Sequence, residues 1–168
     1  FNNKYSFLFP GQGSQFKGMG LSQLNKLDFA SHCYNISETV LGYDIRKILN
    51  TNDINRTLHT QPAIFIDSII KDYLLKQNDI YPIAVSGHSL GEYSALVSSD
   101  VINFKDALKI IKIRSEEMEK AGNNNTGGML AIIGANHKQI KEICLNGDVL
   151  VPANYNSKEQ TVLSGDKS

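Results

Sequence analysis

A Gly-x-Ser-x-Gly frame inside the stretch IAVSGHSLGEYSAL makes Ser89 the strongest candidate for a nucleophile in this sequence. An apolar run precedes the frame and a helical pattern follows it, which is the strand–turn–helix setting of a reactive serine. Such a turn needs small residues two positions to either side, here Gly87 and Gly91, so that strand and helix can pass closely. The Leu90 N–H would then point to where an oxyanion forms. A plain helix cap is the alternative interpretation of the serine.

The glycine-rich loop FPGQGSQFKGMG also follows a predicted strand. Phe16 stands where a dinucleotide-binding loop needs its third glycine, and Met19 where a phosphate-binding loop needs lysine, so a nucleotide site is disfavoured. Gln12 and Gln15 lie on this loop, and a loop at the carboxyl end of a strand can reach the turn that follows a neighbouring strand. We therefore predict that the loop forms the second wall of the serine site, with a simple flexible turn as the alternative.

Arg114 is a charge in the apolar stripe of a predicted helix. In FKDALKIIKIRSEEMEKAG, a rotation of about 100° per residue places Arg114 between Ile110 and Met118. A guanidinium in such a stripe must be paired, because a buried and unpaired charge is costly. Its partner is either an internal Asp or Glu, or a substrate carboxylate, which arginine binds through two parallel hydrogen bonds. If Arg114 faces Ser89, the second alternative selects an acyl group with a free carboxylate.

The elements that must position these residues are a mixture of strands and helices, so we predict an α/β fold. Strands are expected at 5–9 and 82–85, both buried, and at 128–134, 149–156 and 161–165. Helices are expected within 21–58 with a break at Gly42, at 60–76 with Thr60 as cap and Pro62 in the first turn, after the serine turn, at 104–121 with Asn103 as cap, and at 137–146.

The order of the last elements is β-α-β-β, which is the beginning of a split βαββαβ module that lacks one helix and one strand. The two strands of the first region are too few for the helices around them. We therefore expect the chain to be part of a larger protein, with an Asn/Gly linker between the regions.

Composition excludes several function classes. The 168 residues are 41% hydrophobic and 20% charged, and 17 basic residues balance 17 acidic ones. We therefore expect neither nucleic acid nor a membrane as a partner, and no apolar stretch approaches the roughly 20 residues that span a bilayer. Cys33 and Cys144 belong to no Cys-x-x-Cys motif and are expected to be free thiols. The histidines lack metal-ligand spacing, so no metal is predicted.

Stretches along nearly the whole chain share the order of motifs of one family. These are LFPGQGSQ, TQPAIF, GHSLGEYSALV, the helix with Arg114 and Met118, GGMLAIIG and NYNSKEQTVLSG. The chain resembles the malonyl-CoA:acyl-carrier-protein transacylase family. The resemblance implies a hydrolase-like parallel-sheet core at 1–126 and an inserted ferredoxin-like (βαββαβ) subdomain that begins at 127–168, both incomplete in this chain.

The resemblance also assigns roles by position. Ser89 would be the nucleophile, Gln12 and the Leu90 amide would frame the oxyanion hole, and Arg114 would hold the malonyl carboxylate. His88 is expected to pack against its surroundings and not to act as the base. Residues at other motif positions are expected to line the cleft, namely Gln61, His88, Met118, Asn154, Asn156 and Gln160.

The catalytic histidine of the family belongs to a motif beyond the subdomain. None of His32, His59, His88 and His137 matches that motif. A serine without its base is nearly inert, so this chain alone is not expected to turn over. We expect the histidine after Ser168, in the rest of the same protein or in another chain.

The activity that the resemblance implies is a ping-pong reaction. The malonyl group of malonyl-CoA would pass through a malonyl-serine ester to the phosphopantetheine thiol of acyl carrier protein, without any further cofactor. This reaction belongs to fatty acid biosynthesis, in bacterial cytoplasm or a plastid. A discrete acyltransferase of a polyketide synthase, a serine thioesterase or esterase, and a non-catalytic partner of a carrier protein remain as alternatives.

Overall fold

The computed structural model describes residues 4–124, 127–145 and 149–166. The chain is α/β, with one parallel and one antiparallel sheet. It divides into two compact units, the first ending at Glu119 and the second beginning at Lys120. The predicted boundary between residues 126 and 127 adjoins 125–126, which lie outside the described residues.

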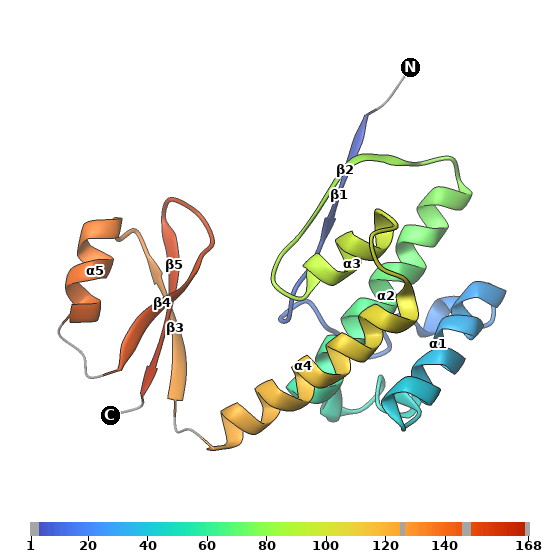
Figure 1. Cartoon of the computed structure of the whole chain (residues 1–168), viewed down its shortest axis with the longest axis horizontal. Coiled ribbons are helices and arrows are strands. Elements are labelled where there is room, and N and C mark those ends of the chain that lie inside the picture. The colour runs from blue at the N-terminus through green and yellow to red at the C-terminus, as the bar shows by residue number, and fades with distance from the viewer. Residues whose placement is uncertain (1–3, 125–126, 146–148, 167–168) are drawn as a thin grey trace. The chain divides into compact units, whose positions relative to one another are not determined.

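The first unit combines a parallel strand pair with four helices, as Figure 1 shows. Strands β1 and β2 are paired in register from Ser6 and Ala84 to Phe9 and Gly87. Helix α3 packs on both strands and on α2, which also contacts α1. The elements are β1 (Tyr5–Phe9), α1 (Asp28–Leu41), α2 (Thr57–Gln77), β2 (Pro82–Gly87), α3 (Gly91–Ser98) and α4 (Phe104–Asn124), with short 3₁₀ turns at Leu21–Gln23, Ile45–Lys47 and Asn52–Asn55.

Both predicted strands of this unit form, but the expectation that they are buried is wrong. Only Phe7 and Phe9 of β1 are buried, while Leu8 is 79% exposed. In β2, Ile83 is 66% exposed and no residue is fully buried. The reason is that the described helices leave part of this two-stranded pair uncovered.

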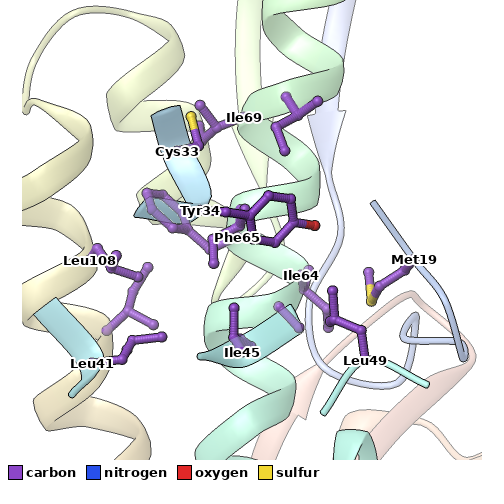
Figure 2. Packing of buried hydrophobic residues seen from close by; sticks show 14 of the residues in the cluster. Met19, Cys33, Tyr34, Leu41, Ile45, Leu49, Ile64, Phe65, Ile69 and Leu108 are labelled. Carbon is purple, nitrogen blue, oxygen red and sulfur yellow. The ribbon is translucent and has the colours of Figure 1, made fainter. Parts of the chain in front are cut away.

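The core of the first unit lies between helices. Helix α2 is buried along most of its length, because other helices pack around it. Figure 2 shows the side chains that converge there, with Tyr34 from α1, Phe65 from α2 and Leu108 from α4. Phe65 is fully buried and stacks on Phe104 with ring centroids 5.3 Å apart. This helical core supplies the rigid support for the loops described below.

The predicted start of α2 is wrong by four residues, because the helix begins at Thr57 and not after Thr60. Pro62 therefore lies inside the helix, where it cannot donate the backbone hydrogen bond that the Leu58 carbonyl would otherwise accept. The hydroxyl of Tyr43 donates to that carbonyl at 3.4 Å. A contact from another segment thus satisfies the group that the proline leaves open.

Two other predicted helix ends, at Asn103 and Gly42, are confirmed. Asn103 caps α4, since its Oδ1 accepts a hydrogen bond from the Asp106 N–H at 2.9 Å. Gly42 ends α1 with a φ of 85°, a conformation that glycine adopts without strain. Helix α4 continues to Asn124, three residues beyond its predicted end.

The second unit is a three-stranded antiparallel sheet with one helix, and it confirms the predicted β-α-β-β order. Its strand order is β3-β5-β4, so that β5 lies between the two strands that α5 connects. Asn136 and Gln139 form reciprocal hydrogen bonds of 3.0 Å that cap α5. The elements are β3 (Gly127–Ile133), α5 (His137–Leu145), β4 (Leu150–Tyr155) and β5 (Gln160–Asp166).

We expect Phe65→Ala to lower the free energy of unfolding by about 3–5 kcal/mol, because it leaves a cavity beside Phe104 in the helical core. Val101→Ala is the control, since Val101 is 70% exposed and should change stability by less than about 0.5 kcal/mol. Urea denaturation of the two variants measures the difference. Equal losses would contradict the assignment of the core.

Candidate active site

Ser89 lies at the tip of a tight turn that joins β2 to α3. Its φ is +53°, a left-handed conformation that is uncommon for a residue other than glycine. The turn is closed by hydrogen bonds from the Gly91 N–H to the His88 carbonyl at 2.9 Å and from the Glu92 N–H to the Ser89 carbonyl at 3.2 Å. Ser89 is exposed, so its hydroxyl stands clear of the strand pair.

The two glycines of the frame are required by backbone contacts. A Cβ atom on Gly91 would collide with the carbonyl of Phe9 at the end of β1. A Cβ atom on Gly87 would collide with the backbone of Gly91 and with the Glu92 nitrogen. The sequence argument for small residues at these positions therefore has a specific cause, which is the direct passage of α3 over the ends of both strands.

The backbone N–H of Leu90 is available to a ligand. The side chain of Leu90 is buried in the core, and this burial anchors the start of α3. No hydrogen bond to the Leu90 N–H is found within the described part of the chain. Because the amino end of a helix also carries a partial positive charge, this donor suits a developing oxyanion.

The glycine-rich loop lies beside the serine turn, as predicted. The His88 N–H donates to the Phe9 carbonyl at 3.0 Å, and a Cβ atom on Gly11 would stand 2.7 Å from the His88 carbonyl oxygen. The side chain of Gln12 points to the start of α2, where its Nε2 donates to Thr57 Oγ1 at 3.1 Å. Over residues 4–124, the backbone N–H of Gln12 has no partner and remains available.

The guanidinium of Arg114 contacts the serine directly. Its Nη2 donates to Ser89 Oγ at 3.0 Å, and its Nη1 donates to Gln61 Oε1 at 2.5 Å. None of the ion pairs found among the described residues involves Arg114. Among the described residues, Arg114 therefore has no Asp or Glu partner, and the first alternative is not supported.

The expectation that Arg114 lies in the centre of the apolar stripe is wrong. The buried residues of α4 are Ala107, Leu108, Ile111 and Ser115. Ile110 and Met118, which flank Arg114 on the helix, are 42% and 45% exposed. Arg114 is thus half-buried at the edge of the stripe, because α4 turns a neighbouring arc of its surface toward the core.

Gln61 is a buried partner of Arg114, and its predicted role in lining a cleft stays a prediction. Its side chain is completely buried in α2, and its Nε2 donates to the Met118 sulfur at 3.2 Å. Both ends of the amide are therefore held by α4. Because glutamine is neutral, it orients the guanidinium without cancelling its positive charge, which leaves that charge for an anionic ligand.

Sequence reasoning missed a carboxylate that joins α4 to α2. Glu119 Oε1 accepts hydrogen bonds from Arg56 at 3.0 and 2.8 Å, and Glu119 Oε2 accepts one from the Leu58 N–H at 3.3 Å. Burial would raise the pKa of Glu119, but the hydrogen bonds from Arg56 and Leu58 hold it below its usual value. No local pattern reveals this link, since the partners are more than sixty residues apart.

The described histidines form no hydrogen bond with Ser89. His88 is exposed, its Nδ1 lies near Gly11, and the prediction that it packs and does not act as the base stays a prediction. His59 Nδ1 is 3.0 Å from the Asp53 carbonyl, and the ring of His137 lies against Tyr155 in the second unit. No hydrogen bond between a histidine and Ser89 is found among residues 4–124.

Asn154, Asn156 and Gln160 belong to the second unit, around the turn between β4 and β5. Asn156 Nδ2 donates to Gln160 Oε1 at 2.9 Å, and the Asn156 N–H donates to the Gln160 carbonyl at 3.0 Å. These bonds close the turn. The role of these residues in lining a cleft stays a prediction.

Other kinds of site find no support in the residues that the structure describes. There is no group of three or more His, Cys, Asp or Glu side chains that would hold a metal ion. No helix in the described ranges combines the length and apolarity that crossing a bilayer requires. Cys33 is a free, buried thiol, and burial raises its pKa to about 12, which makes it a poor nucleophile.

Comparison with known proteins connects this geometry to a family. Residues 6–168 match the family described as the acyl transferase domain. The chain belongs to the acyl transferase domain family. It is 37% identical to the malonyl CoA-acyl carrier protein transacylase of Salmonella typhimurium over 98% of this chain and 55% of the relative. Identity to the enzyme of that name from Staphylococcus aureus is 36%, over 99% of this chain and 56% of the relative.

Solved structures of acyl transferases agree with the fold. The malonyl-CoA:ACP transacylase of Synechocystis matches 98% of this chain and 55% of its own, with 36% identity and a TM-score of 0.88. A type II PKS acyl-carrier protein in complex with its malonyl-transacylase matches 98% of this chain and 56% of its own, with 34% identity and a TM-score of 0.87. The chain thus spans about half the length of the relatives it matches.

We expect Gly91→Ala to destabilise the protein by about 3 kcal/mol, because the added methyl group meets the Phe9 carbonyl and must displace α3. Gly122→Ala is the matched control. Gly122 lies in α4 with open space around it, so alanine should raise stability by about 0.5–1 kcal/mol. Chemical denaturation gives both values, and a neutral Gly91→Ala would contradict the tight approach of turn and strand.

Proposed function

We propose that the protein transfers a malonyl group from malonyl-CoA to the phosphopantetheine thiol of an acyl carrier protein, through a malonyl ester on Ser89. The observation that carries this proposal is the hydrogen bond from Arg114 Nη2 to Ser89 Oγ, made by a guanidinium without a carboxylate partner among the described residues. A cation at the nucleophile favours an acyl group that itself ends in a carboxylate. The names of the relatives above support the same substrate.

In the first half-reaction, Ser89 Oγ attacks the thioester carbonyl of malonyl-CoA as a base takes its proton. The N–H groups of Gln12 and Leu90 stabilise the tetrahedral oxyanion, and coenzyme A leaves as a thiol. During this step Arg114 Nη2 releases the serine oxygen and binds the malonyl carboxylate. The Nε of Arg114, for which no partner is found in the described residues, binds the same carboxylate. The contact from Gln61 keeps the guanidinium in place during this exchange.

In the second half-reaction, the phosphopantetheine thiol attacks the malonyl-serine ester and restores the free serine. The base in both steps is proposed to be a histidine from outside residues 1–168, since no described histidine forms a hydrogen bond with Ser89. Among the motif residues, Met118 lies one helical turn from Arg114, and its sulfur accepts a hydrogen bond from Gln61 Nε2 at 3.2 Å. The bacterial relatives favour bacterial cytoplasm over a plastid.

The proposed architecture is a hydrolase-like parallel core, residues 1–126, with an inserted ferredoxin-like subdomain that starts at 127–168. The parallel pair β1–β2 that leads into the serine turn supports the first part. The order β3-β5-β4, with β5 between the strands that α5 connects, supports the second.

A discrete acyltransferase that serves a polyketide synthase is the second candidate function. It is favoured by the similarity to the malonyl-transacylase that was solved with a type II PKS acyl-carrier protein. The chemistry at Ser89 and Arg114 would be the same, and only the carrier would differ.

Labelled malonyl-CoA should place its malonyl group on Ser89 in the full-length protein, because Ser89 is the nucleophile on the strained turn. Peptide mass spectrometry after rapid quenching locates the label, and Ser89→Ala should remove it. Addition of holo acyl carrier protein should discharge the ester. Label on another residue, or fast hydrolysis of malonyl-CoA without any carrier, would contradict the proposal, and the second result would favour a thioesterase.

Arg114→Ala should lower kcat/KM for malonyl-CoA about 10- to 100-fold relative to acetyl-CoA, because it removes charge-assisted hydrogen bonds to the substrate carboxylate. The control is Arg46→Ala, whose guanidinium is bound to Asp44 and Glu38 away from the serine turn. Parallel assays with the two thioesters measure the ratio. An unchanged malonyl preference would remove Arg114 from substrate selection.

A further inference from the structure

Ser14 and Gln15 follow the oxyanion-hole residue Gln12 on the glycine-rich loop and have no role in the reaction proposed above. We propose that both are positioning residues, which aim the Gln12 backbone N–H at the oxyanion formed on Ser89. This inference rests on the proposed function and adds to it the means by which one of its two hydrogen-bond donors is held in place.

Ser14 acts on the peptide group that contains the Gln12 N–H. Its hydroxyl donates to the Gly11 carbonyl oxygen at 2.9 Å. That oxygen and the Gln12 N–H belong to one planar peptide group, and no cis peptide bond occurs in the described chain, so the two point in opposite directions. Holding the carbonyl oxygen on the side of Ser14 therefore directs the N–H to the other side.

The same peptide group is also fixed in position beside the nucleophile. A Cβ atom on Gly11 would stand 2.7 Å from the carbonyl oxygen of His88 and 2.9 Å from its Nδ1. The backbone of Gly11 thus lies so close to the residue that precedes Ser89 that no side chain fits between them. This close approach limits movement of the peptide group relative to the serine turn. The hydrogen bond from the Ser14 hydroxyl limits rotation of the peptide plane.

Gln15 holds the next peptide group and ties the loop to the rest of the unit. Its Oε1 accepts a hydrogen bond from the Gly13 N–H at 2.8 Å, and its Nε2 donates to Asn55 Oδ1 at 3.1 Å. Gly13 has a φ of +108°, a conformation that glycine adopts without strain. The loop therefore has a defined turn here, to which the Gln15 side chain is hydrogen-bonded. Asn55 ends the 3₁₀ turn just before α2. The first residue of α2, Thr57, accepts the hydrogen bond from the Gln12 side chain.

A backbone N–H directed at the oxyanion changes kcat and not KM. The negative charge on the oxygen develops only in the tetrahedral transition state, so a donor directed at it raises kcat without strengthening substrate binding. The donor also acts on the thioester carbonyl and not on the malonyl carboxylate. Disturbing Ser14 or Gln15 should therefore slow acylation by any thioester equally, and the preference for malonyl set by Arg114 should persist.

The test compares Ser14→Ala, Ser14→Thr and Ser31→Ala in the full-length protein. Ser31 is the matched control, because its hydroxyl also donates to a backbone carbonyl, that of Leu24 at 3.0 Å, but on α1. Rapid-quench acylation of Ser89 is measured with malonyl-CoA and with acetyl-CoA. We expect Ser14→Ala to lower kcat about tenfold with both thioesters and to leave KM unchanged. One oxyanion hydrogen bond raises the rate roughly 10²- to 10³-fold, and a misdirected donor loses part of that effect.

Ser14→Thr keeps the hydroxyl and should retain the parental rate, as should Ser31→Ala. For the second residue, Gln15→Glu keeps the acceptor for the Gly13 N–H and should be faster than Gln15→Met, which removes it. The inference is overturned if Ser14→Ala matches Ser31→Ala, if threonine fails to restore the rate, or if only the malonyl reaction slows.

A second measurement separates this inference from the proposed function. In ¹⁵N-labelled protein, the Gln12 amide resonance should shift in Ser14→Ala and return to its parental position in Ser14→Thr, whatever acyl group the protein handles. An unshifted resonance overturns the inference by itself. If the parent forms no malonyl-Ser89 while the resonance shifts, the proposed function fails and the positioning of the Gln12 N–H stands.

Discussion

The approach of backbone to backbone at the serine turn is the constraint on which the site depends. Helix α3 begins directly over the ends of β1 and β2, and only glycine at position 91 lets it lie against the Phe9 carbonyl. In the same turn Ser89 has a left-handed conformation, and its side chain is exposed. The contact with the Phe9 carbonyl also places the residues that follow Phe9 beside the turn, so that the glycine-rich loop after β1 lies next to the serine that follows β2.

The first turns of α2 are the second organising feature, because every other part of the site is bonded to them. The glycine-rich loop reaches Thr57 through Gln12, and α4 reaches Leu58 through Glu119. Gln61, one turn further along, holds Arg114. A buried helix is a suitable anchor for these contacts, since its core packing limits its movement relative to the loops. The loop that carries the proposed oxyanion donor and the cation of α4 are thus both bonded to one buried helix.

The choice of glutamine as the partner of Arg114 decides what the site can do. A carboxylate at position 61 would neutralise the guanidinium and make the pair a purely structural bridge. The neutral amide satisfies one nitrogen, takes its own support from the Met118 sulfur, and leaves the positive charge facing Ser89. A half-buried cation without a counterion among the described residues favours an anionic ligand, so the proposed preference for a diacid rests on this arrangement and not on the serine turn, which esterases share.

Local patterns in the sequence determined the serine turn with its two glycines, the Asn103 cap, the strands and the order of the second unit, because each depends on residues close together in the chain. Sequence alone could not locate the start of α2, since the Tyr43 hydroxyl that satisfies Leu58 comes from another segment. It also misplaced Arg114 on its helix, because packing by distant elements selects the arc that is buried. Only the tertiary structure decided that this guanidinium meets Ser89 and Gln61 and not an internal acid, since hydrogen bonds between residues so far apart leave no local signal in the chain.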